Sequence, residues 1–197
     1  MPAYNAEISA GSLLPLESKR LAALLLTQPD EAAWWHAVAV ENILQKKTPA
    51  TARRQATLIR KRLSTLDAAG WSLLIDRGQE VAMQLLLVAA IRHSQLLGDF
   101  MRHVYAERQR GLEHHLVQRD WQAFLADCAH HDGAVAGWSE TTRAKLFQVI
   151  VRILVEAKYL VDARTMTLTP QSLHPEVRRY LAASHDTQMI HCLERAP

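Results

Sequence analysis

One segment in the N-terminal half of the chain, residues 46–66, reads KKTPATARRQATLIRKRLSTL. It opens with a helix start signal, because Thr48 is a good N-cap residue and Pro49 fits the first turn of a helix. Apolar residues then recur at alternating spacings of four and three, which predicts a helix with one buried stripe. The stripe consists of Ala52, Ala56, Ile59, Leu63 and Leu66. We therefore expect an amphipathic helix here, anchored by its apolar face.

The same segment concentrates the positive charge of the chain. Residues 42–66 hold seven of the 23 lysines and arginines and no acidic residue. The seven are Lys46, Lys47, Arg53, Arg54, Arg60, Lys61 and Arg62. The other 16 (23 less seven) face 20 Asp and Glu, so this segment produces the net charge of +3. No acidic residue at i,i+4 neutralises these charges within the segment, which favours a polyanion, most often nucleic acid, as the partner.

A solvated helix face is the simpler explanation of a charge run. However, unpaired like charges on adjacent turns repel one another, and a polyanion would relieve that repulsion. The residues expected to contact phosphates are Lys46, Lys47, Arg53, Arg54, Arg60 and Lys61. Thr48 and Thr51 are expected to add hydroxyl and backbone N–H donors at the helix N-terminus. With about six phosphates engaged, log affinity should fall with log salt at a slope of about −5.

Length and composition indicate a folded, helical, intracellular protein. A chain of 197 residues suits one large domain or two small ones, and 49% hydrophobic with 22% charged residues is typical of globular proteins. Seven Gly and seven Pro favour long helices with short loops. Cys128 and Cys192 form no Cys-x-x-Cys pair and are expected to be reduced thiols. Without a secretory signal or a long apolar run, we expect a cytoplasmic location and no membrane partner.

The rest of the chain is also predicted to be mainly helical. The expected helices cover residues 15–26, 31–45, 67–77, 79–97, 99–109, 120–129, 140–157 and 175–183. We divide the chain into an N-terminal basic, helix-turn-helix-like part, residues 1–77, and a C-terminal helical part, residues 78–197. The predicted fold class is thus all-α, with one small β-hairpin near the C-terminus.

That hairpin belongs to residues 139–184, which are typical of a winged-helix unit. A helix over 140–157 is followed by residues 159–169, whose alternation across a polar bend predicts the hairpin. In a winged helix, the helix before the hairpin enters the major groove and the wing reaches the backbone. The residues predicted to face DNA are Lys145, Gln148 and Arg152 on the helix and Arg164 at the hairpin tip. A hairpin that only stabilises the fold is the alternative, since many winged helices bind proteins.

The sequence offers little for catalysis or metal binding. Adjacent histidines at 114–115 and 130–131 point to different sides of a helix, and no third ligand accompanies Asp127 and His131. Residues 156–158, EAK, resemble the end of a nuclease motif, but no Pro-Asp partner precedes them in a strand. Neither a phosphate-binding glycine loop nor a nucleophile–base pair is found. We therefore expect no enzymatic activity, no metal, no cofactor and no small-molecule substrate.

Several segments resemble a known family. They are residues 8–14 (ISAGSLL), 17–18 (ES), 41–54 (ENILQKKTPATARR), 60–63 (RKRL), 96–100 (LLGDF) and 156–160 (EAKYL). In these segments the chain resembles the BrxA family of BREX bacteriophage-defence systems. The likeness is spread over most of the chain, and its specific segments lie in the first half. It implies an all-helical DNA-binding protein with helix-turn-helix-like parts and a NusB-like helical arrangement, and it brings no catalytic residues.

Charge and resemblance lead to one hypothesis with two alternatives. We expect a non-enzymatic component of a BREX system that binds double-stranded DNA through residues 46–62, with residues 139–184 as a second surface. RNA binding, by analogy with NusB, is one alternative, because charge alone does not separate A-form from B-form ligands. The other is a protein-interaction adaptor whose basic helix docks on an acidic partner. Other BREX components are further expected partners.

Overall fold

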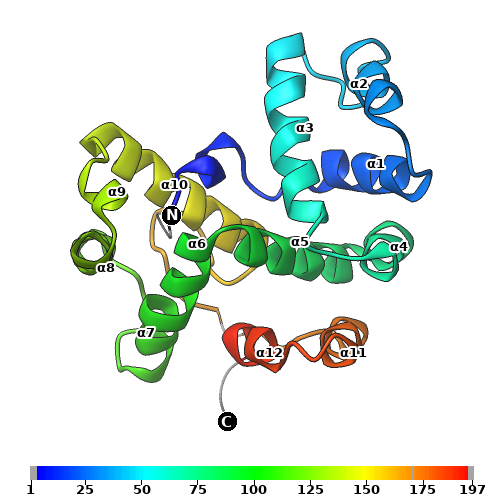
Figure 1. Cartoon of the computed structure of the whole chain (residues 1–197). Coiled ribbons are helices and arrows are strands. Elements are labelled where there is room, and N and C mark those ends of the chain that lie inside the picture. The colour runs from blue at the N-terminus through cyan, green and yellow to red at the C-terminus, as the bar shows by residue number, and fades with distance from the viewer. Residues whose placement is uncertain (1–3, 170, 195–197) are drawn as a thin grey trace. The chain divides into compact units, whose positions relative to one another are not determined.

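The computed structural model describes residues 4–169 and 171–194, and its regular elements are helices (Figure 1). The predicted all-α class is confirmed. The chain forms two compact units, one of them Leu13–His93. The other combines the described residues from Ser94 onward with those up to Ser12.

The unit Leu13–His93 is built from five helices. They are α1 (Pro15–Leu26), α2 (Glu31–Ala39), α3 (Pro49–Leu63), α4 (Ala68–Asp76) and α5 (Gln79–His93). Helix α5 is apolar nearly all round, is buried from Val81 to Ile91 apart from Met83, and packs on α1, α3 and α4. Because of this packing, the unit extends to His93, whereas the sequence analysis divided the chain after residue 77.

Side-chain caps start three of these helices, among them the Thr48 cap predicted from the sequence. Asp30 accepts a hydrogen bond from the backbone N–H of Ala33 (2.7 Å) and Asp67 from that of Gly70 (2.9 Å). Thr48 accepts one from the backbone N–H of Thr51 (3.2 Å). Each cap satisfies a backbone donor that the helix itself leaves unpaired.

Helix α2 ends at Ala39, six residues before the end predicted from the sequence. The chain turns because Asn42 and Gln45 adopt left-handed backbone conformations, with φ of 50° and 53°, that a right-handed helix does not accommodate. The Asn42 side chain then bridges the backbone of Lys46, accepting from its N–H (2.9 Å) and donating to its carbonyl (3.0 Å). Residues 40–48 therefore form a structured connection between α2 and α3.

The second unit contains the remaining helices. They are η1 (Glu7–Ala10), α6 (Gln95–Asp99), the π-helical turn η2 (Phe100–Tyr105), α7 (Ala106–Arg110), α8 (Gln118–His131), α9 (Gly133–Ala136), α10 (Glu140–Glu156), α11 (Pro175–Ala183) and α12 (Thr187–Leu193). An aromatic cluster forms its core, with Phe100 packed edge-on against Trp121 and Phe124, and Trp121 stacked on Phe147 of α10. The cluster joins the π-helical turn to α8 and α10.

The predicted β-hairpin is wrong: residues 4–169 and 171–194 contain no β-strand. The chain does turn back, but only an isolated antiparallel bridge, Leu160 to Leu168, joins the two arms. Extended pairing is interrupted on the second arm at Met166, whose φ of 48° lies outside the strand conformation. The bend is held by Asp162, whose carboxylate accepts from the backbone N–H groups of Arg164 (2.7 Å) and Thr165 (2.8 Å).

Within the described residues, no single helix is long and apolar enough to cross a membrane. Among residues 4–169 and 171–194, the consecutive helical stretches Gln79–His93 and Gln95–Arg110 reach the length and composition of a span only when they are taken together.

Candidate nucleic-acid interface

Helix α3 is anchored as its sequence predicts. All five residues of the apolar stripe, from Ala52 to Leu66, are buried, and the helix packs on α1, α2 and α5. The exposed face carries Arg53, Arg54 and Lys61. These charges are therefore presented by a helix whose position is fixed by its own core contacts.

The seven cations of the segment have three different environments. Four are exposed: Lys47, Arg53, Arg54 and Lys61. Lys46 and Arg60 are partly covered, and Arg62 is buried with an exposed fraction of 3%. The uniform cationic face inferred from the sequence is therefore smaller in the folded chain.

Lys46 is used within its own unit. Its ammonium group forms an ion pair with Glu17 of α1, and the two side chains are only 20% and 17% exposed. Burial acts to raise the pKa of the Glu17 carboxyl. The hydrogen bonds from Lys46 and from the backbone, together with the positive charges of Lys46 and Arg20, outweigh burial and hold that pKa below its ordinary value. The pair joins α1 to the start of the basic segment, which makes Lys46 a poor phosphate ligand.

Arg60 and Arg53 lie against two tryptophans of α2. The Arg60 guanidinium stands 4.6 Å from the centroid of the Trp34 ring and donates through Nη1 to Oε2 of Glu31 (2.7 Å). The Arg53 guanidinium lies 5.9 Å from the centroid of the Trp35 ring. Both distances are within the range of cation–π attraction.

Glu31 also accepts a hydrogen bond from the Trp35 indole N–H, at 2.6 Å from Nε1 to Oε1. Hydrogen bonds from Arg60 and Trp35 hold the pKa of the Glu31 carboxyl below its ordinary value, so the group is ionised at neutral pH. Glu31 and Trp35 were not among the residues predicted for this surface. The four-residue spacing from Glu31 to Trp35, which aligns them on one helix face, was the available signal.

The two threonines of the predicted site close the N-terminus of α3. The Thr48 hydroxyl donates to Oγ1 of Thr51 (2.9 Å) and accepts from its backbone N–H. Thr48 is thus occupied as a cap, whereas the Thr51 hydroxyl keeps its own hydrogen for donation to a ligand.

The second predicted surface lies on α10, in the other unit. Ser139 caps this helix by accepting from the backbone N–H of Thr142 (3.2 Å). Lys145, Gln148 and Arg152 are exposed along one side of α10, and Arg164 is exposed at the bend held by Asp162. Arg152 donates through Nε to the Glu156 carboxylate at 3.1 Å.

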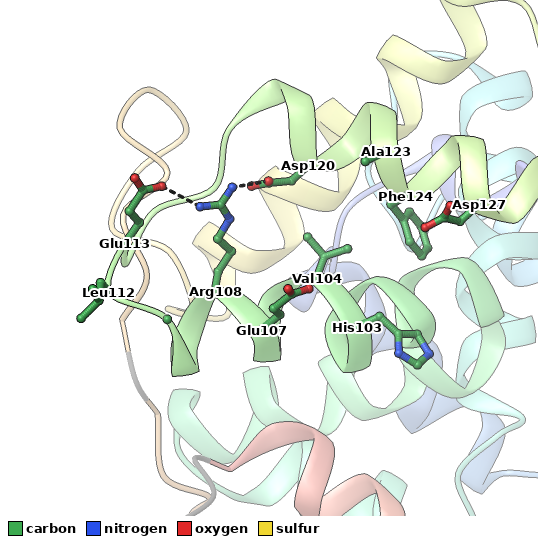
Figure 2. A pocket seen from close by; sticks show the side chains of 11 residues that line it. His103, Val104, Glu107, Arg108, Leu112, Glu113, Asp120, Ala123, Phe124 and Asp127 are labelled. Atoms are coloured by element: carbon green, nitrogen blue, oxygen red, sulfur yellow. Dashed lines mark hydrogen bonds and ion pairs between the residues drawn. The ribbon is translucent and has the colours of Figure 1, made fainter.

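A hollow of about 530 Å³ lies in the same unit, lined by residues of η2, α7 and α8 and by the loop between α7 and α8 (Figure 2). Its lining includes four acidic residues, Glu107, Glu113, Asp120 and Asp127. Arg108, in the same lining, is engaged by Glu113 (2.8 Å) and Asp120 (2.5 Å), as Figure 2 shows. The acidic lining would repel phosphate, so this hollow is no part of a nucleic-acid surface. Across the described residues, His, Cys, Asp and Glu side chains form no group of three that could hold a metal ion.

Comparisons with known proteins agree with the family resemblance seen in the sequence. The family model BrxA matches residues 2–185. The BREX protein BrxA of Paramagnetospirillum magneticum is 38% identical over 193 residues, which cover 98% of this chain and 97% of that protein. The BREX protein BrxA of Escherichia coli O9:H4 is 33% identical over 192 residues, covering 98% and 90%. A crystal structure of a protein from Magnetospirillum magneticum matches with a TM-score of 0.91 and 36% identity, over 99% of this chain and all of that one.

Proposed function

The chain belongs to the BrxA family of BREX defence systems, and from this premise we propose that it serves such a system as a non-enzymatic, cytoplasmic protein that binds duplex DNA. The observation that carries the proposal is the exposed face of α3, where Arg53, Arg54 and Lys61 lie with Lys47 just before the helix. Cations on a rigid element attract the phosphate backbone at long range and release its counterions on contact.

The buried stripe supports this assignment. Because Ala52, Ala56 and Ile59 fix α3 in the core, the ordering of the helix is already complete before DNA arrives. Binding then costs mainly the ordering of the exposed side chains, which favours affinity.

In this proposal, α2 and α3 act as a helix-turn-helix-like pair. The N-terminal half of the second helix faces the base edges in such motifs, and Arg53 and Arg54 occupy that half of α3. The connection over residues 40–48 is longer than the three to four residues of a standard motif. The proposed likeness to a helix-turn-helix motif is therefore that α3 contacts DNA as the second helix does; the turn between the two helices differs.

The outer side of α10 is proposed as a second contact, in the manner of a winged helix without paired strands. Lys145 and Arg164 suit phosphates, while the Gln148 amide can donate to and accept from a base edge. Arg152 is less available, since Glu156 already engages it.

The proposal is tested by competition. Full-length protein bound to a fluorescently labelled DNA duplex is titrated with unlabelled DNA or RNA duplex of equal length at two salt concentrations. DNA should displace the label at lower concentration than RNA. Stronger competition by RNA would replace the DNA assignment with RNA binding. Binding to neither duplex, together with a salt-resistant complex with another BREX component, would favour the adaptor.

A further inference from the structure

Two hydrogen-bond donors on the α2–α3 face converge on one carboxylate. Nη1 of Arg60 lies 2.7 Å from one oxygen of Glu31, and Nε1 of Trp35 lies 2.6 Å from the other. The Arg60 guanidinium is held against the Trp34 ring, which is fully buried, so this donor has a defined position. The arrangement is a preformed binding site for an oxyanion, and in this structure the occupant is a side chain of the protein itself.

The occupant is exposed. The Glu31 side chain is 64% exposed, whereas Glu17 in the Lys46 pair is only 17% exposed. Exposed ion pairs contribute little to stability, because water screens them and both side chains lose freedom. Of Glu17 and Glu31, Glu31 is therefore the one that an incoming anion can displace.

The location of this site points to the class of anion. It adjoins the exposed cations of α3, and Arg53 stands over the Trp35 ring, which adds positive charge beside the donors. A nucleic-acid phosphate offers two free oxygens to two such donors, as a carboxylate does.

We propose that Arg60 and Trp35 form a phosphate-binding subsite of the α3 surface, filled by Glu31 in the free protein and by a backbone phosphate in the nucleic-acid complex. The assignment of the phosphate to nucleic acid rests on the proposed function. Glu31 then lowers affinity, because its charge cancels that of Arg60 and must be displaced on binding.

The first test measures duplex affinity in a double-mutant cycle. Glu31→Gln should raise affinity about eightfold at about 0.1 M salt and steepen the salt slope by about 0.9, because the charge of Arg60 is then no longer cancelled when the phosphate binds. Arg60→Gln alone should change affinity less than about twofold, since its charge is already cancelled. The double variant should return to within about twofold of the unmodified chain, because the subsite has lost its cation.

Glu41→Gln is the matched control. It removes the same charge just after α2, where Glu41 contacts His36 (3.1 Å) and no arginine of α3. The subsite would be overturned if Glu31→Gln raised duplex affinity no more than Glu41→Gln does. The subsite would also be overturned if Glu31→Gln raised duplex affinity equally in a chain that carries Arg60→Gln. Reduced affinity in Glu31→Gln would also overturn it, by showing that Glu31 positions Arg60 for binding.

A second measurement does not depend on DNA binding. The indole N–H signal of Trp35, assigned by its loss in Trp35→Phe, is followed by NMR during titration with inorganic phosphate. It should shift in Glu31→Gln and stay unchanged in the unmodified chain. A constant signal in both proteins would refute the subsite. A shift in a protein that binds no duplex would retain the anion site and refute only the proposed function.

Discussion

Raising the salt concentration should weaken DNA binding by an amount set by the cations that can reach phosphates. A protein that neutralises Z phosphates of B-DNA loses affinity with a log–log slope of about −0.9Z. The sequence alone suggested about six phosphates and a slope of about −5. Three of the seven cations should add little to the slope, because Lys46 pairs with Glu17, Glu31 cancels the charge of Arg60, and Arg62 is buried.

Four exposed cations remain on the α3 surface, so the expected slope is about −3.6. It is measured by fluorescence anisotropy with a labelled duplex, using the variant Lys145→Ala/Arg164→Ala, which leaves Arg152, paired with Glu156, as the one predicted cation of the α10 surface. Affinity should fall about 150-fold between about 50 and 200 mM salt.

Two results would contradict the assignment of the four exposed cations to phosphate contacts. A slope shallower than about −2 would mean that the exposed face of α3 is not the main contact. A slope of about −5 or steeper in the same variant would mean that Lys46 and Arg62 also neutralise phosphates, against the ion pair of the one and the burial of the other.

The sequence predicted the features of this surface that depend on neighbouring residues. The Thr48 cap and the buried stripe of α3 follow from spacings within one turn or one helix, which the chain carries locally. The burial of helix α5 likewise follows from its continuous apolar run, which lies within one helix.

Features that depend on the tertiary fold were missed. The partners of Lys46 and Arg60 each lie 29 residues away, on α1 and α2, and no pattern within the basic segment indicates them. The prediction of a β-hairpin was wrong for a different reason. The alternation of residues 166–169 is too short to fix a strand, and the left-handed backbone of Met166 interrupts it.

Other predictions follow from single residues. Thr48→Ala should destabilise the chain by about 1 kcal/mol through loss of the helix cap, seen as a lower midpoint of denaturant unfolding, while Thr48→Ser should not. Gln148→Ala should change discrimination among duplexes more than overall affinity, and Arg164→Ala should weaken binding to all duplexes, both measured by gel shift; the reverse pattern would remove α10 from the interface. Purified protein should neither hydrolyse nucleotides nor cut DNA with magnesium or manganese, and cleavage abolished by Glu156→Gln would contradict this.

Binding of DNA to the exposed face of α3 is tested most directly by the affinity of Arg53→Ala/Arg54→Ala/Lys61→Ala for unrelated duplexes. These residues lie off the buried stripe, so the fold should persist, which circular dichroism checks. The control, Arg110→Ala/Arg119→Ala/Arg179→Ala, removes the same charge from exposed positions of the other unit. At about 50 mM salt the α3 variant should lose at least about 100-fold in affinity for every duplex, and the control less than about threefold. A folded α3 variant that binds as tightly as the control would contradict the account.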